Sequence, residues 1–265
     1  MKDNVFENHG IEKVSPSSIN LFVDNTPKWA AKYLLGMPQG QKPVFWRGDV
    51  IDKSCGRFFG MLEDQEQMNK EDCIAIAGEQ YLGLAKAYEE DGLEVDPDEV
   101  TKQAKHLDTF IELAIDHYAS LGTPTEYQKP IETLVDECPV PLTGFLDFIY
   151  DGDVRVVRDL KTTAKTPDMR RSVRRQLAVY AQAEQAYPIV DYVYVNSRAR
   201  EVVSMKVTDW EAQMMDVRRI LLSMKSLLSV SSDAEEIVGL LYPDFEKWSW
   251  DADEIAYAKN IWSIK

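Results

Sequence analysis

Five strand-like segments occupy residues 125–207, and one helix-like segment separates the third of them from the fourth. The second and third strands are joined by Asp151-Gly152-Asp153, a turn signal that predicts a hairpin. The intervening helix is expected to begin at Thr166-Pro167-Asp168 and to run to about Ala186. This order predicts an α/β fold with a mixed central sheet flanked by helices, in which the strands are 125–135, 142–150, 154–161, 189–196 and 201–207.

The residues before the sheet have helical periodicity and predict an N-terminal helical layer at about 14–121. Ser15 followed by Pro16 is typical of a helix start. Further helices are predicted at 29–35, 66–90 and 98–121. After the sheet, Thr208 to Glu211 has the pattern of a capping box for a helix that reaches Val230. We expect a single domain over residues 1–265, with a catalytic core at about 125–207 and C-terminal helices at 208–265.

Composition supports a folded globular chain. The 45% apolar content of 265 residues can fill a core. The N-terminal segment resembles neither a signal peptide nor a transit peptide, and no apolar run has the length of a membrane span, so a cytoplasmic protein is expected. Cys55, Cys73 and Cys138 lack the spacing of zinc or redox sites and are expected to be ordinary buried thiols.

Charge is distributed unevenly along the chain. The net charge of −15 argues against a nucleic-acid partner, because phosphate is bound by Lys and Arg. Residues 155–175, however, carry eight Lys and Arg against two Asp, a net +6 in an otherwise acidic chain. A solvated helix face is an equally good explanation of such a run. The candidate phosphate contacts in this window are Lys165, Arg170, Arg171, Arg174 and Arg175.

The predicted hairpin gathers opposite charges. Asp159 and Lys161 are two residues apart on one strand, so their side chains share a face. With a three-residue loop at 151–153, Asp147 of the partner strand lies opposite Val157 and shares that face, whereas a two-residue loop would put it on the other face. We predict the odd-numbered loop.

Two carboxylates and an ammonium group at one sheet edge suit the hydrolysis of a phosphodiester. Asp147 and Asp159 would hold Mg²⁺ or Mn²⁺, which polarises the phosphate and activates water. Lys161 would orient that water or stabilise the developing charge. The alternative is an Asp–Lys surface pair of an edge strand. No nucleotide-binding loop and no serine-hydrolase motif competes with this interpretation.

These residues resemble the PD-(D/E)XK nuclease superfamily, and in particular its RecB-like and phage exonuclease branch. The similarity spans about residues 14–207 and rests on the segments SPSS, GFLD, VRDLKTT and QLAVY, which begin at residues 15, 144, 157 and 176. The resemblance implies a restriction-endonuclease-like core, metal ligation by Asp147, Asp159 and the carbonyl of Leu160, and a catalytic Lys161. It also implies that Gln176 and Tyr180, one turn apart on a helix, contact DNA or steady the site.

The chain departs from the family pattern in two places. Where relatives often have a metal-binding histidine after an Arg-Gly pair, this sequence has Asp52, which is a candidate second metal ligand or a helix-surface acid. Glu126 is a weaker candidate of the same kind. Some relatives bind an iron–sulfur cluster through four cysteines, and this chain has three cysteines outside that pattern, so no cluster is expected. Trp248, Trp250 and Trp262 are expected to pack in that place.

The resemblance therefore implies a Mg²⁺- or Mn²⁺-dependent deoxyribonuclease. The interpretation we favour is an exonuclease that acts on linear duplex or single-stranded DNA ends in replication, recombination or phage genome processing. The alternatives are a structure-specific endonuclease of the same fold and a catalytically silent module that binds DNA ends or a protein partner. A homo-oligomer or a recombination partner protein is compatible with all three.

Overall fold

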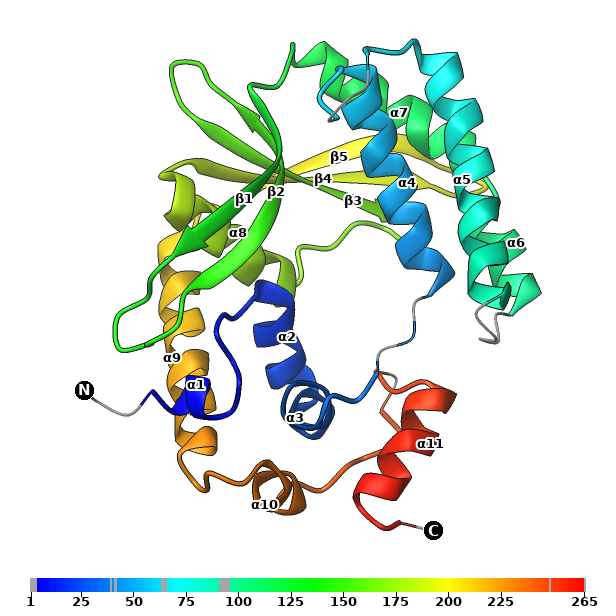
Figure 1. The fold of residues 1–265 in the computed structure, drawn as a ribbon. Coiled ribbons are helices and arrows are strands. Elements are labelled where there is room, and N and C mark those ends of the chain that lie inside the picture. Colours follow the sequence, from blue (N-terminus) through cyan, green and yellow to red (C-terminus); the bar gives the residue numbers. More distant parts are fainter. Residues whose placement is uncertain are drawn as a thin grey trace.

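The computed structural model describes residues 4–38, 40, 42–62, 66–90, 96–247 and 249–264. A five-stranded mixed sheet crosses its centre, with helices on both faces, as the sequence predicts (Figure 1). The strands follow in the order β1-β2-β3-β4-β5, and all neighbours are antiparallel except β3 and β4, which are parallel. Their bounds are Glu126–Thr133, Leu142–Tyr150, Val156–Thr163, Tyr187–Val195 and Arg200–Lys206.

The hairpin between β2 and β3 keeps the predicted parity but has a longer loop. Tyr150 pairs with Val156, so residues 151–155 form the connection instead of three residues. A shift of two residues leaves every side chain on its predicted face. The shift changes the residue of β3 that lies opposite Asp147, however. The last pair is Phe148 with Arg158, so the next residues along the two strands, Asp147 and Asp159, lie opposite each other and not Asp147 and Val157 as predicted. The two carboxylates are therefore level with each other.

Helix α8 (Arg171–Glu184) makes the crossover between the parallel strands β3 and β4. It begins five residues later than the predicted start at Thr166. Pro167 disfavours helical backbone at the residue before it, and Arg170 is still extended, with φ −66° and ψ 150°. The helix ends at Gln185, whose φ of +51° is left-handed, and Pro188 lies inside β4.

One helical layer covers the face of the sheet toward the upper right of Figure 1. The predicted helix 98–121 is divided at His106, whose φ of +68° interrupts the helical backbone. No bounds are predicted from the sequence for helix α4, although Pro43 lies in its first turn; the helix buries Arg47 and Arg57 and contains two glycines, which weaken its apolar periodicity. The layer consists of α4 (Pro43–Phe58), α5 (Lys70–Glu90), α6 (Pro97–Ala104) and α7 (Leu107–Ser120).

The remaining helices lie on the other side of the sheet and below it in Figure 1. The Ser15 side chain caps α2 as predicted, accepting from the Ser18 amide. The capping box at Thr208 does not form: α9 begins after Asp209, whose carboxylate accepts from Gln213 and Arg174. These helices are α1 (Val5–Asn8), α2 (Pro16–Asp24), α3 (Thr26–Leu35), α9 (Trp210–Leu228), α10 (Ala234–Gly239) and α11 (Ala252–Ile261).

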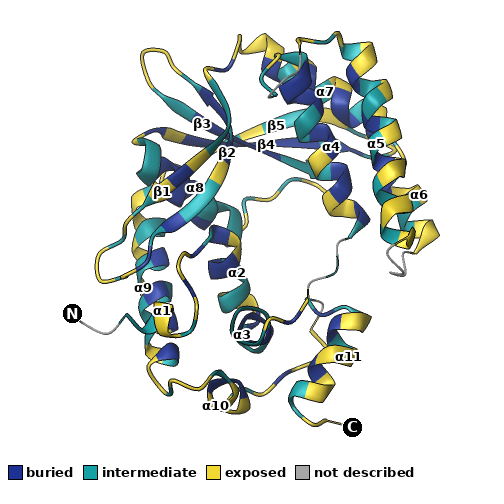
Figure 2. Ribbon diagram, in the orientation of Figure 1, coloured by how far each residue is buried: buried dark blue, intermediate teal, exposed yellow. Residues whose placement is uncertain are grey.

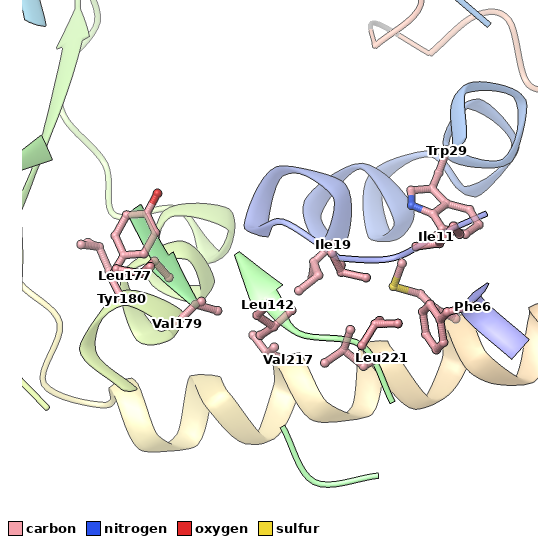
Figure 3. Packing of buried hydrophobic residues seen from close by; sticks show 14 of the residues in the cluster. Phe6, Ile11, Ile19, Trp29, Leu142, Leu177, Val179, Tyr180, Val217 and Leu221 are labelled. Carbon is pink, nitrogen blue, oxygen red and sulfur yellow. The ribbon is translucent and has the colours of Figure 1, made fainter. Parts of the chain in front are cut away.

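Two hydrophobic cores lie on opposite faces of the sheet, and Figure 2 shows buried residues concentrated along the strands and the inner helix faces. Figure 3 shows the first core, in which Leu177 and Val179 of α8 join Val217 and Leu221 of α9. The Tyr180 ring lies at one end of this cluster. The sheet is therefore fixed on both faces, which gives its edge residues defined positions.

The C-terminal aromatic residues make a small third cluster. Trp250 packs with Ala31 and Met37, and Trp262 packs beside it and donates from Nε1 to the carbonyls of Val238 and Leu241. Trp248 lies outside the described residues. Cys55 and Cys73 are buried, Cys138 is half-buried, and all three are free thiols. Among the described helices, none has the length and apolar character of a membrane span.

Candidate active site

Asp147, Asp159 and Lys161 lie together where β2 and β3 run side by side. Lys161 Nζ donates to Asp159 Oδ1 at 3.0 Å and lies 2.8 Å from Oδ2. Asp147 Oδ2 accepts from the backbone amide of Leu160 at 2.7 Å, which holds the carboxylate against β3. The structure thus brings together the three groups that the alternation of the strands predicts.

Helix α8 supplies a second contact to Asp159. Gln176 Nε2 donates to Asp159 Oδ1 at 3.0 Å and to the Tyr180 hydroxyl at 2.9 Å. The Tyr180 ring packs so close to β2 that a Cβ atom at Gly144 would lie 3.1 Å from it. A glycine at this position therefore lets α8 approach the strand that carries Asp147. Gln176 and Tyr180 are both at the site, as the resemblance implied.

Asp52 reaches the same site from α4 on the opposite helical layer. Its Oδ2 accepts from the Tyr127 hydroxyl at 2.7 Å and from Gln128 Nε2 at 2.9 Å. Gln128 Nε2 also lies 3.2 Å from Asp147 Oδ1 and so joins the two carboxylates. Gly56, one turn after Asp52, gives Tyr127 its room, because a Cβ there would lie 2.7 Å from the Tyr127 ring.

Gln128 is the site residue that sequence reasoning missed. Its neighbours Tyr127 and Lys129 pair with Phe148 and Leu146, so Gln128 lies level with Asp147. Its φ of +46° is unusual for a residue with a side chain and interrupts the regular alternation of β1. The register of β1 against β2 could have indicated Gln128, but the sequence alone does not fix that register.

Burial raises the pKa values of all three carboxylates at the site. Burial raises the pKa of Asp147 well above its usual range, and the charges of Asp159 and Asp52 add to this. Burial also raises the pKa of Asp159, against the opposing effect of Lys161. The pKa of Asp52 is about 7, chiefly through burial. Burial would lower the pKa of Lys161, but Asp159 and Asp147 outweigh it, so the pKa is raised and the ammonium form persists at neutral pH.

The donor atoms fit a hard divalent cation. Among the described residues, Asp52 Oδ1 is a buried oxygen without a hydrogen-bond partner, and such an atom is costly unless a cation or water meets it. No three His, Cys, Asp or Glu side chains of the described residues form a ready-made metal cage. Mg²⁺ is commonly held by one or two carboxylates, with substrate phosphate and water completing its shell. Asp147, Asp159 and the Leu160 carbonyl suit that arrangement.

Glu126 does not lie with this group. It accepts from Arg155 at 2.6 Å and from Lys129 at 3.1 Å, and both cations also contact Glu184 of α8. Glu126 pairs with Ile149, two residues beyond Asp147, where the hairpin loop presents Arg155. The Glu126 carboxylate is therefore paired with two cations and makes none of the hydrogen bonds that join Asp52, Asp147 and Asp159 to their neighbours.

Half of the Lys and Arg side chains at 155–175 are paired with carboxylates within the protein. Arg155 pairs with Glu126, Asp151 and Glu184, and Arg174 with Asp209. Arg175 is 8% exposed and donates to Asn20 Oδ1 at 2.8 Å, so it is not a surface phosphate contact. Lys165, Arg170 and Arg171 are exposed and have no carboxylate partner among the described residues.

A second charge cluster lies behind the site. Arg158 alternates with Asp159 and so faces α7, where it makes two hydrogen bonds to Asp191, at 2.7 and 2.8 Å. Ser204 donates to Asp191 Oδ1 at 2.5 Å, and His117 Nε2 lies 3.2 Å from the same oxygen. Asp191 is fully buried. This cluster ties β3 to β4, β5 and α7 directly beneath Asp159.

Comparison with known proteins gives a family and a fold. The family model for the PD-(D/E)XK nuclease superfamily matches residues 13–231. A crystal structure of a "Putative exonuclease" from Eubacterium rectale is similar with a TM-score of 0.56 and 15% identity, over 92% of this chain and 88% of that one. The structure of SSO0001 covers 70% of this chain and 87% of its own, with a TM-score of 0.34 and 12% identity, which is too distant to support an argument. No curated protein matches the chain.

Proposed function

We propose that this chain, which belongs to the PD-(D/E)XK nuclease superfamily, hydrolyses phosphodiester bonds of DNA with Mg²⁺ or Mn²⁺ held at Asp147 and Asp159. The observation that carries the proposal is the convergence of these two carboxylates with Lys161 and Gln176 at the inner strands β2 and β3. The contacts of Gln176 and Tyr180 support placement in the RecB-like and phage exonuclease branch. The chain's three cysteines are one fewer than a cubane cluster needs, which supports a member without iron–sulfur.

In this mechanism, the protein's residues position the reacting groups. The bound cation would act as a Lewis acid on the phosphate and lower the pKa of water. Lys161 remains an ammonium at neutral pH, so it stabilises negative charge on the phosphate and orients water instead of removing a proton. Gln176 fixes Asp159, while the Leu160 amide and Gln128 fix Asp147. Asp52, which Gln128 bridges to Asp147, is in position to hold a second cation.

We propose an exonuclease that acts on DNA ends. The fold-level similarity to a protein described as an exonuclease is compatible with this mode. The test is digestion of linear duplex, closed circular duplex and single-stranded DNA with Mg²⁺, Mn²⁺ or EDTA. We expect loss of linear DNA and of single strands only when metal is present, and no change in the closed circle. Nicking or cleavage of the circle would instead indicate an endonuclease, and no cleavage of any DNA would indicate a binding module.

Arg170 and Arg171 are proposed to contact DNA phosphates at the start of α8. Replacing either by alanine is expected to weaken DNA binding similarly for all sequences, because one phosphate contact and its released counterions are lost. The slope of log K against log salt should fall by roughly 0.7 to 0.9 per residue. Fluorescence anisotropy at several salt concentrations measures this slope. Arg219→Ala, on α9 and 71% exposed, is the control that should leave the slope unchanged.

A further inference from the structure

An open cleft of about 740 Å³ runs from the candidate active site between α2, β2 and the start of α4. At one end it is lined by Gln176 and Tyr180, the pair that contacts Asp159. In Figure 1 these elements come from three parts of the chain: α2 and α4 from its first quarter, β2 from its middle and α8 from beyond β3. A ligand in this cleft would therefore contact the helix that holds Asp159 in place.

Exposed phenylalanines are concentrated in this cleft. The sequence has nine phenylalanines, all at described positions, and Phe45 and Phe145 are the two that are more than half exposed, at 56% and 61%. Both line the cleft. Phe45 is in the first turn of α4, and Phe145 is in β2, two residues before Asp147. Scattered exposed apolar residues are ordinary, but two aromatic rings in one cleft beside a catalytic site form a defined surface.

The charged residues of the cleft do not favour binding through ionic contacts to DNA phosphates. Its two lysines are already paired: Lys28 is buried against Glu254, and Lys42 Nζ lies 3.5 Å from Asp251. Its lining also includes Asp24 and Glu254. The lining acids therefore equal the lining lysines in number, so the cleft offers a DNA ligand aromatic surface in place of net positive charge.

We propose that this cleft binds an unpaired DNA strand, with bases stacked on Phe45 and Phe145, and so delivers a single-stranded end to the site of Asp147 and Asp159. The proposal rests on the nuclease function above and names its substrate class. Every base presents a π-face, so stacking on aromatic rings needs no base pairing and tolerates any sequence. In a duplex those faces are stacked within the helix and are not available to the protein.

The test measures binding in EDTA, by fluorescence anisotropy, of three ligands: a thymidine oligonucleotide, an abasic strand with the same number of phosphates, and a blunt duplex. Phe45→Ala and Phe145→Ala are each expected to raise the Kd for the thymidine oligonucleotide about tenfold, with little effect on the Kd for the abasic strand or the duplex. Phe145→Trp should retain thymidine binding, because the stacking surface remains. Tyr242→Ala, 83% exposed and outside the cleft lining, is the matched control.

Three results would overturn the proposal. Wild-type affinity for thymidine in the double alanine variant would exclude stacking on these rings. An equal loss for thymidine and the abasic strand would show that the rings act on the backbone or on the fold. If the wild-type protein cleaves DNA and the alanine variants give either of these two results, only this inference fails. If it neither binds nor cleaves any DNA, the proposed function fails as well.

Discussion

Replacing Asp159 by asparagine is expected to reduce metal-dependent DNA cleavage by about 10³-fold, the scale of losing a principal electrostatic group at a catalytic site. Asp159 accepts hydrogen bonds from both Lys161 and Gln176, and its buried carboxylate carries the negative charge that a metal ligand needs. Asparagine keeps the shape and one acceptor but removes the charge that would bind metal. Initial rates on linear DNA, measured at saturating Mg²⁺ or Mn²⁺, give the ratio.

Loss of activity alone does not separate catalysis from folding, so a thermal-melting measurement belongs beside it. Wild-type protein should melt at higher temperature when Mn²⁺ is added, because a ligand that binds only the folded state stabilises it. Asp159→Asn should fold without metal and should lose most of this shift. Asp168→Asn, an exposed acid ahead of α8, is the control and should keep both activity and shift. Full activity in Asp159→Asn would remove Asp159 from the metal site.

Asp191→Ala is expected to destabilise the protein by about 3 to 5 kcal/mol, because it leaves the Arg158 guanidinium buried without its partner. Arg158 is 9% exposed, and Asp191 is the carboxylate to which it donates both hydrogen bonds. Denaturant unfolding measures the loss. Asp216→Ala removes an exposed pair with Arg219 and should cost about 0 to 1 kcal/mol. A cost for Asp191→Ala no greater than that of the control would contradict the role of this cluster.

The same cluster gives a pH dependence of known sign. Burial alone would raise the pKa of Asp191, but hydrogen bonds from His117 and Arg158 and the charge of Arg158 lower it to about 2. An aspartate whose folded pKa lies below its unfolded value of about 3.9 stabilises the fold above that value. The stability difference between wild type and Asp191→Asn should therefore be constant above about pH 5 and shrink between about pH 4 and pH 2. Asp52 and Asp147 have raised pKa values and act in the opposite sense, but they are common to both proteins.

The sequence predicted the catalytic strands well because side chains alternate along a strand. The face on which a side chain lies depends only on whether the loop has an odd or an even number of residues. The hairpin loop is two residues longer than expected, so Asp147 stays on the predicted face. The same rule could not identify Gln128, because its left-handed φ breaks the alternation and its partner across β2 depends on register. The place of Asp52 at the site cannot be predicted from the sequence either, because it depends on how α4 packs on the sheet.

Charge counting was the weakest part of the sequence interpretation. Residues 155–175 sum to +6, but Arg155, Arg158 and Arg174 meet carboxylates from β1, α8, β4 and the segment before α9. Those partners are distant in sequence, so no window can include them. The two cleft phenylalanines cannot be recognised from the sequence for the same reason, because the exposure of a side chain depends on packing and not on residue type.

The contacts of strand β3 limit which positions of this protein can be substituted in a redesign. From Val157 to Lys161 every side chain already has a structural contact, since Val157 and Leu160 fill the two cores, Arg158 binds Asp191, and Asp159 and Lys161 pair at the candidate site. An engineer who wishes to change the ligand of the candidate site therefore has no spare position on this part of β3. The rim of the cleft, where Phe45 and Phe145 meet water, can be varied without disturbing either core.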